Sequence, residues 1–462
     1  MKPAPAWLLA AGLALGGCIS TTVDSESLRS AAAARQRRVA PSAPPLSRDV
    51  DALLRAPLTA ESAAQIAVLN NRGLRAALED VAVAQSTLAG TRRLPNPTLE
   101  GALRFRDGAD PELEIGAMID VSDLLLALSR GTAASTGVEA ARLAAIGAII
   151  DQSCSTREAF IEYQAAVQRL ELRRTALLGI SVASEAAERL REAGNITELE
   201  LVNEQSATRE AELRYRRAEV MVGAARERVN VAMGVWGRGI EWQAEARLPE
   251  LPEREIAIKA LETDAVRHSL DLQLAERRFA AAAKHANLAR VAGVLPELKA
   301  GVSAERDDHW SVGPAVELEL PLFYQGQGEI GALQATLRRE QERHAELAIR
   351  IRAAARTVAT QLEGAREAAI YYRDVLLPLK QRVVEQSQLH YNAMSIGIFQ
   401  LLQAKRDQVE TASSYIDQLR DYWIARTRAE QLLSGRLAAA SLDAAAADPA
   451  SPRSSGGPVD AH

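Results

Sequence analysis

Four short segments of the chain alternate between apolar and polar residues at every second position. The first segment places Leu99, Gly101, Leu103 and Phe105 on one face. The other segments are residues 112–120, 298–305 and 311–320. A period of two over about 9–11 residues is typical of a strand with one apolar face, and it is the signature of membrane-barrel strands. Short polar stretches join the segments in pairs, which predicts two strand hairpins.

Long stretches without proline predict two very long helices. No proline occurs between Pro111 and Pro249, and only Pro378 lies between Pro321 and Pro449. Proline inside a helix removes a backbone hydrogen bond and clashes with the preceding turn, so these gaps permit unbroken helices over residues 123–193 and 326–393. At 1.5 Å per residue, each helix would be about 100 Å long, which suits a rod or a tunnel wall.

The same layout occurs twice, at an offset of about 200 residues. The long helices end at residues 194–197 and 394–397, where Gly, Asn, Ser and Thr favour a turn, and a second helical run follows each turn. Such a repeat indicates an internal duplication. We therefore expect a first repeat over residues 59–233, with a strand hairpin at about 98–120 and a helical hairpin at about 123–233. A connector over 234–255 leads to a second repeat over 256–436, with hairpins at about 297–322 and 326–435.

The N-terminus has the pattern of a secretory signal. A basic residue and an apolar run of about 10 residues, too short to span a membrane, precede Leu15-Gly16-Gly17-Cys18. This ending resembles the bacterial lipobox, which implies a signal peptide over residues 1–17, a lipid anchor at Cys18 and transport to the outer membrane. Residues 18–58 form a polar lipid-anchored segment, and residues 437–462 are rich in Ala, Asp, Ser, Pro and Gly, which predicts a disordered tail.

Composition narrows the class further. The net charge of −5 argues against a nucleic-acid surface, and Cys154 is the one cysteine after Cys18, so a disulfide framework is excluded. No stretch after the signal is apolar enough for a transmembrane helix, so any crossing must be made by strands. The six histidines do not cluster, and no catalytic set has a suitable spacing. We expect no enzyme activity, no cofactor and no metal site.

Four strands are too few to close a barrel, and an open sheet edge in hydrocarbon leaves backbone groups unpaired. Eight strands enclose an interior that side chains fill, whereas twelve leave a lumen. The expected fold is therefore mainly α, with duplicated strand and helical hairpins that form a trimeric 12-stranded β-barrel continued by an α-helical periplasmic tunnel.

This order of elements resembles the TolC family of outer-membrane efflux factors over nearly the whole mature chain. Leu94-Pro95-Asn96-Pro97 is similar to the start of the first barrel strand in the heavy-metal branch, and Leu320-Pro321-Leu322-Phe323 to the exit from the last strand. The resemblance implies the outer-membrane channel of a tripartite efflux system. It also implies a homotrimer, a periplasmic adaptor and an inner-membrane pump, most often of the RND type, as partners.

The resemblance also implies where the functional residues lie. The periplasmic aperture of such a channel is formed at the helical-hairpin tips, where family members carry a ring of carboxylates. The matching positions are Gln400 and Gln403, which are uncharged, whereas Glu200 keeps a carboxylate in the first repeat. Tyr391 matches a tyrosine that can form a hydrogen bond between coils in the closed state.

Two alternatives compete with this interpretation. Gly326, Gly328 and Gly331 match a dinucleotide-binding pattern, but the helix that follows is too long for the roughly 30-residue unit that such a site requires. The stronger alternative is a periplasmic coiled-coil adaptor or structural lipoprotein without a transmembrane barrel, in which the strands form a small soluble sheet.

Overall fold

The structure of the chain is a computed structural model that describes residues 23–39, 49–93, 95–105, 111–245, 247–294, 297–306, 309–320, 322–323 and 325–437. The chain divides into two compact units, and each draws residues from both repeats. The first unit contains Ala76–Ile146 and Leu272–Glu346, with the chain up to Leu28; the second contains Arg29–Arg75, Gly147–Asp271 and the chain from Leu347. The signal sequence, Cys18 and the tail from residue 438 lie outside the described residues.

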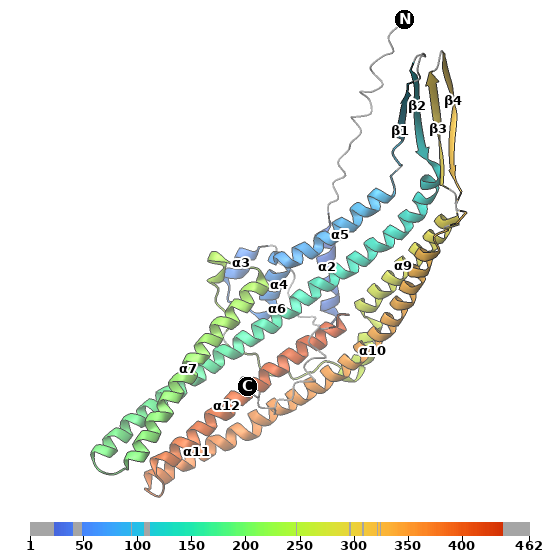
Figure 1. Ribbon diagram of the computed structural model, residues 1–462. Coiled ribbons are helices and arrows are strands. Elements are labelled where there is room, and N and C mark those ends of the chain that lie inside the picture. Colours follow the sequence, from blue (N-terminus) through green and yellow to red (C-terminus); the bar gives the residue numbers. More distant parts are fainter. Residues whose placement is uncertain are drawn as a thin grey trace, which may run out of the picture. The chain divides into compact units, whose positions relative to one another are not determined.

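A four-stranded antiparallel sheet in the order β1-β2-β3-β4 belongs to the first unit (Figure 1). Its strands are β1 (Thr98–Arg104), β2 (Glu112–Asp120), β3 (Glu297–Arg306) and β4 (Trp310–Glu319). Both predicted hairpins are present, and β2 also pairs with β3 along eight residue pairs from Leu113↔Arg306 to Asp120↔Lys299. The two repeats therefore share one sheet, whose outer strands are β1 and β4.

The pairing register gathers the apolar residues of all four strands on one face. Leu99 lies opposite Ala117, which lies opposite Val302, which in turn lies opposite Pro314. Residues directly opposite each other in an antiparallel sheet point to the same side, so the predicted alternation of each strand adds up across the sheet. Leu99 is 79% exposed and Val312 is 70% exposed, so the described residues do not cover this apolar face.

The helices of the first unit start close to the sheet. β2 runs directly into α6 (Val121–Glu192), and the carboxylate of Asp120 accepts a hydrogen bond from the backbone N–H of Asp123 at 2.8 Å. Helix α9 (Leu270–Val294) packs on α6, where Lys284 donates to the hydroxyl of Thr136 at 2.7 Å. Helices α5 (Arg72–Thr91) and α10 (Gln327–Tyr371) complete this part of the chain.

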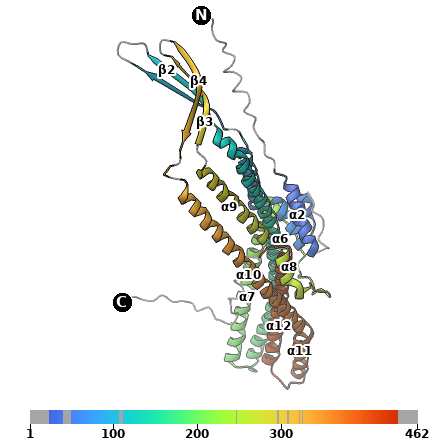
Figure 2. The ribbon, with the colours of Figure 1, turned by 90° about the vertical axis from the view of Figure 1, so that its right-hand side faces the viewer.

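The second unit is built on two helical hairpins. The C-terminal part of α6 and α7 (Glu198–Met233) form the first hairpin. Helices α11 (Leu377–Asn392) and α12 (Ile398–Leu433) form the second, as Figure 2 also shows. Helices α7 and α12 are each 36 residues long and begin exactly 200 residues apart, in agreement with an internal duplication. The shorter elements are α2 (Ser25–Val39), α3 (Val50–Arg55), α4 (Ala60–Asn70), α8 (Leu261–Arg267) and the 3₁₀ turns Gly237–Ile240 and Ile258–Ala260.

The connector between the repeats is held against the helices by aromatic residues. Trp242, Phe160 and Tyr163 lie in one buried cluster, with the Tyr163 and Trp242 ring centroids 5.2 Å apart. The guanidinium of Arg226 lies 4.0 Å from the Trp242 ring centroid, and its Nη2 donates to the Trp242 carbonyl at 2.6 Å. Elsewhere in the connector, Glu255 accepts a hydrogen bond from the fully buried Tyr422 hydroxyl at 2.6 Å. These contacts make the connector an ordered part of the second unit.

The second long helix runs without a break from Gln327 to Asn392, as predicted for residues 326–393, but it is not a regular α-helix throughout. Residues Tyr372–Leu376 form a π-helical segment between α10 and α11, just before Pro378. Proline lacks the N–H that an α-helix requires and its ring crowds the carbonyl four residues earlier, here that of Asp374, so the helix widens by one residue. The proline-free α6 stays regular for 72 residues, about 108 Å of helix.

The expectation that no helix after the signal is apolar enough to cross a membrane is also wrong. One 18-residue window of α6 has a mean hydropathy of 1.3 and at most two charged residues, and 39% of it is buried. The many alanines and leucines of α6 produce this value, and a buried helix of a protein core has the same composition. Length and composition therefore do not distinguish the two for α6.

Candidate functional site at the helical-hairpin tips

The first hairpin turns at residues 193–197, where the backbone follows a standard helix-ending motif. Gly194 adopts the left-handed conformation with φ of 76°, and the N–H of Asn195 donates to the Leu190 carbonyl at 2.8 Å. The Thr197 side chain then caps α7 by accepting a hydrogen bond from the Glu200 N–H at 3.2 Å. Glycine here avoids the steric conflict that a Cβ meets in this conformation.

The second hairpin turns in the same way but with a different residue at the critical position. Met394 adopts φ of 57° and is 93% exposed, and the N–H of Ser395 donates to the His390 carbonyl at 2.9 Å. Gly397 caps α12 without a side-chain hydrogen bond. A left-handed methionine is strained relative to glycine, so the two tips share their geometry but differ in conformational cost.

Glu200 caps the N-terminus of α7 at the first tip. Its carboxylate accepts hydrogen bonds from the Thr197 N–H at 2.8 Å and from the Thr197 hydroxyl at 2.9 Å, which completes a capping box. The backbone N–H of Thr197 and then its hydroxyl lower the pKa of Glu200. The carboxylate is therefore ionised at neutral pH and turned toward its own helix end.

The other predicted aperture residues lie on the second hairpin. Gln403 is exposed and donates to the Asp407 carboxylate at 2.8 Å, while Lys380 of α11 lies 3.4 Å from the same carboxylate. Gln400 is exposed, and Tyr391 is half-buried at the end of α11. The structure thus reveals an acidic residue, Asp407, one turn beyond Gln403. The predicted lipidation site Cys18 lies outside the described residues.

Near the tips, one buried ion pair joins the two hairpins. Arg406 of α12 donates through Nη2 to the carboxylate of Glu204 in α7 at 2.9 Å, and the Glu204 side chain is only 5% exposed. The sequence prediction missed this pair. Glu204 follows Glu200 by one helical turn, but both helices carry many Arg and Glu residues, and nothing in their spacing indicates which two meet across hairpins.

Further from the tips, α6 and α12 are joined by a series of antiparallel polar contacts. Arg157 donates to Glu430 at 2.7 Å, and Glu158 accepts from Arg428 at 3.1 Å. The series continues toward the tips with the ion pairs Arg169–Asp417 and Arg173–Glu410. Burial lowers the pKa of Arg157, but the surrounding negative groups, of which Glu430 acts most strongly, together outweigh burial and raise that pKa. Within this α6–α12 series, the pairs far from the tips are the more buried ones.

The two hairpins contact each other near the tips through a pair in which Glu204 is 5% exposed and Arg406 is 31% exposed. Buried ion pairs are strongly destabilised when one partner is removed, and exposed pairs contribute little. The pair Glu204–Arg406 is therefore the tip contact with the largest effect on whether the hairpins stay together.

The chain combines a sheet that has one exposed apolar face with two long helical hairpins, and these are the elements of the TolC-type fold. Comparison with solved structures confirms this fold. A membrane protein from Pseudomonas aeruginosa matches 85% of this chain and 99% of its own with a TM-score of 0.70 at 18% identity. The outer membrane channel CmeC of Campylobacter jejuni matches 82% of this chain and 86% of its own with a TM-score of 0.67 at 14% identity.

Sequence comparison finds one relative that matches most of the chain at low identity. The cobalt-zinc-cadmium resistance protein CzcC of Cupriavidus metallidurans is 22% identical over 387 residues, which cover 82% of this chain and 90% of the relative. No family model matches the chain. At these identities the structural likeness establishes the fold, including the mainly helical class with a small antiparallel sheet.

Proposed function

We propose that this protein is the outer-membrane channel component of a tripartite efflux system and provides a passive exit duct from the periplasm to the exterior. The observation that carries the proposal is the four-stranded sheet whose apolar face is not covered by any part of the chain that the structure describes. Lipid is the environment in which such a face is stable, and polar residues on the other face suit a water-filled lumen. The likeness to CmeC, an outer membrane channel, supports the same function.

The functional unit in this proposal is a homotrimer. Strands β1 and β4 each have one edge without a partner strand in the described chain. Unpaired backbone groups in hydrocarbon cost several kcal/mol each, so the edges must be covered by other copies of the chain. Three copies provide twelve strands, the smallest multiple of four that leaves a lumen. The long helical hairpins would continue that lumen into the periplasm.

The aperture of this duct lies at the hairpin tips in our proposal. Glu200, Tyr391, Gln400 and Gln403 would surround it, and the ion pair Glu204–Arg406 would hold the hairpins together in the closed state. The neutral Gln400 and Gln403 leave the second tip without the carboxylate ring expected from the family. Because Glu200 caps α7, Glu200→Ala would change the shape of the first tip as well as its charge.

Attachment and partners complete the proposal. Cys18 would carry the lipid anchor in the outer membrane, and a periplasmic adaptor and an inner-membrane pump, of RND type, would deliver the cargo. The relative CzcC is named for resistance to cobalt, zinc and cadmium, which supports metal cations as cargo here. The duct performs transport, and we assign it no chemical reaction.

Two measurements test the channel proposal against the adaptor alternative. The purified mature protein should require detergent, should have the mass of three copies, and should conduct ions in planar bilayers. Its oligomer should migrate differently on gels before and after heating, because barrels resist detergent until heated. A Cys18→Ala protein that is monomeric and soluble without detergent would support the adaptor or structural lipoprotein instead.

A further inference from the structure

Three leucines are exposed in the first turns of α6, directly after the sheet. They are Leu124, Leu125 and Leu128, and Leu128 is 83% exposed. Residues three and four apart are neighbours on the surface of a helix, so the three side chains form one apolar patch. We call this patch the apolar collar. Since β2 runs directly into α6, the collar continues the exposed apolar surface beyond the end of the strand.

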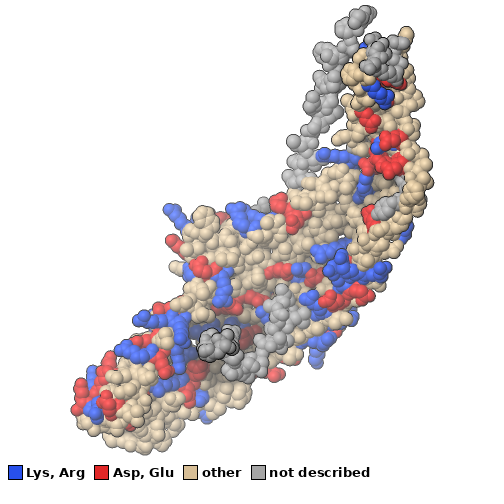
Figure 3. Space-filling view, viewed as in Figure 1, with Lys and Arg blue, Asp and Glu red and all other residues tan. Residues whose placement is uncertain are grey.

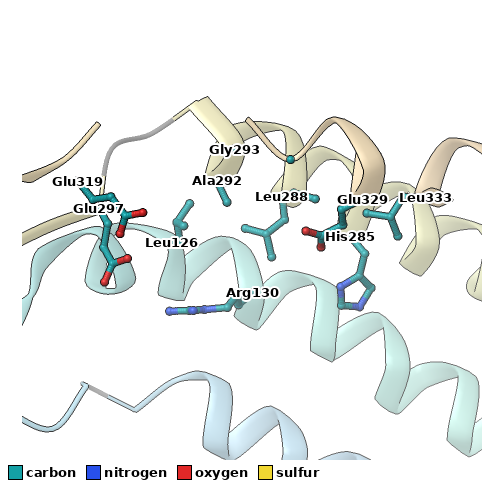
Figure 4. Close-up of a pocket in the computed structure, with 12 residues that line it drawn as sticks. Leu126, Arg130, His285, Leu288, Ala292, Gly293, Glu297, Glu319, Glu329 and Leu333 are labelled. Atoms are coloured by element: carbon teal, nitrogen blue, oxygen red, sulfur yellow. The ribbon is translucent and has the colours of Figure 1, made fainter. Parts of the chain in front are cut away.

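The collar points away from the polar face of the sheet. Leu126 lies on the other side of α6, where it lines a cavity of about 520 Å³ together with Glu297 and Glu319 (Figure 4). Both glutamates alternate with the apolar residues of their strands and therefore belong to the polar face. A step of two residues turns a helix by about 200°, so Leu124 and Leu128 lie nearly opposite Leu126. The collar is thus turned to the same side as the apolar face.

The apolar face by itself is shorter than the apolar band of membrane barrels. Trp310 lies on this face two residues before Val312, and aromatic residues mark the edges of such a band. From Val312 to Leu320 the strand rises about 20 Å, at about 3.3 Å per residue and a tilt of about 40°. The band is about 25 Å tall, and the helix from Leu124 to Leu128 adds about 6 Å. The collar therefore supplies the missing height.

Two basic residues lie one helical turn beyond the collar. The side chain of Arg92 packs over Gly131, where an added Cβ would meet the Arg92 Cγ at 3.4 Å. Gly131 follows Leu128 by three residues and lies on the same side of α6. Arg92 and Arg93 are exposed, and neither forms an ion pair with a carboxylate in the described part of the chain. Figure 3 shows basic side chains at this end of α5, beside the sheet.

We propose that the first turns of α6 lie within the membrane, with the apolar collar in contact with lipid chains and with Arg92 and Arg93 bound to the phosphate of an anionic phospholipid. The inference rests on the proposed function, because it requires the apolar face of the sheet to lie in lipid. Arginine forms strong, charge-assisted hydrogen bonds with phosphate, and basic residues at a membrane surface attract anionic lipids. The edge of the membrane then lies at the turn of α6 that contains Gly131.

Spin labels on single cysteines test where this edge lies. Leu128→Cys is labelled and placed in vesicles of phosphatidylethanolamine and phosphatidylglycerol. The matched controls are Leu99→Cys on the sheet and Leu178→Cys further along α6, both at exposed leucines. Oxygen is enriched in lipid and a nickel chelate in water, so the ratio of their collision rates reports what surrounds the label. Cys154 is buried and does not compete for the label.

The ratio for Leu128→Cys should match that for Leu99→Cys and exceed that for Leu178→Cys several-fold. A water-like ratio at Leu128→Cys would overturn the proposal, as would protection from both reagents, the result expected if a second copy of the chain covers the collar. In either case a lipid-like ratio at Leu99→Cys leaves the proposed function intact. A water-like ratio at Leu99→Cys would instead overturn the proposed function.

Lipid retention tests the two arginines. After extraction from the same vesicles, Arg92→Gln/Arg93→Gln should retain less phosphatidylglycerol than the wild type, as measured by native mass spectrometry. Arg37→Gln/Arg38→Gln removes the same charge from exposed positions on α2 and should retain as much as the wild type. Equal retention in the two variants would overturn the contact between the arginines and the phosphate.

Discussion

Replacing Glu204 by Gln should loosen the contact between the two helical hairpins and open the duct more often. Glu204 and Arg406 are joined by a charged hydrogen bond of 2.9 Å, with side chains 5% and 31% exposed. Glutamine keeps the size of the side chain but removes its charge, so Arg406 loses its counter-ion. The closed arrangement should therefore lose more stability than any arrangement in which the hairpins are apart.

The burial of the pair sets the size of this effect. Exposed pairs contribute at most about 1 kcal/mol, and loss of one partner from a fully buried pair costs about 3–5 kcal/mol. With one partner buried and the other about one-third exposed, we expect about 2 kcal/mol. Since about 1.4 kcal/mol corresponds to a factor of ten, the ratio of open to closed channels should rise about 30-fold.

Single-channel recordings in planar bilayers measure that ratio directly. The reversed pair, Glu204→Arg/Arg406→Glu, should restore part of the wild-type closure. Lys380→Gln is the matched control, because Lys380 pairs with Asp407 at 3.4 Å within one hairpin and does not join the two. Equal open probabilities for wild type and Glu204→Gln, with both proteins trimeric, would refute the role of the Glu204–Arg406 ion pair in closing the duct.

Three further predictions concern the stability and reactivity of single residues. Gly301→Ala should abolish the heat-resistant oligomer on gels, because a Cβ there would overlap the Ala117 carbonyl oxygen, whereas Gly313→Ala meets nothing within 4 Å and should be tolerated. Met394→Gly should stabilise the protein against thermal unfolding by about 0.5–1 kcal/mol, since glycine relieves the left-handed strain; an unchanged midpoint would contradict this. Burial raises the pKa of the Cys154 thiol to about 12, so a thiol reagent at pH 8 should label Cys154 only after unfolding; rapid labelling of the native protein would show that the thiol is accessible.

Much of the fold follows from local sequence patterns. The alternation in residues 98–104 and 112–120 predicted strands because a strand exposes successive side chains to opposite faces. The absence of proline predicted α6, and Gly194 with Thr197 predicted the turn into α7. All of these signals act within a few residues of the chain, where the backbone itself carries the preference.

Local patterns did not predict which distant segments pair with each other. The contact of β2 with β3 joins Leu113 to Arg306, and the alternation of each strand is compatible with several registers and neighbours. The π-helical segment before Pro378 depends on how one helix absorbs a proline, since ending, kinking and widening the helix are all open to the chain.

Some features of the candidate site were predicted from the sequence, and others were visible only in the structure. From the sequence alone came the two hairpin tips, the duplication that relates them and the positions of Glu200, Tyr391, Gln400 and Gln403. Only the tertiary structure decided that Glu200 caps a helix and that Glu204 meets Arg406, about 200 residues away. The reason is physical: caps, turns and strand faces depend on neighbours along the chain, whereas an ion pair between hairpins depends on how two long helices are rotated against each other.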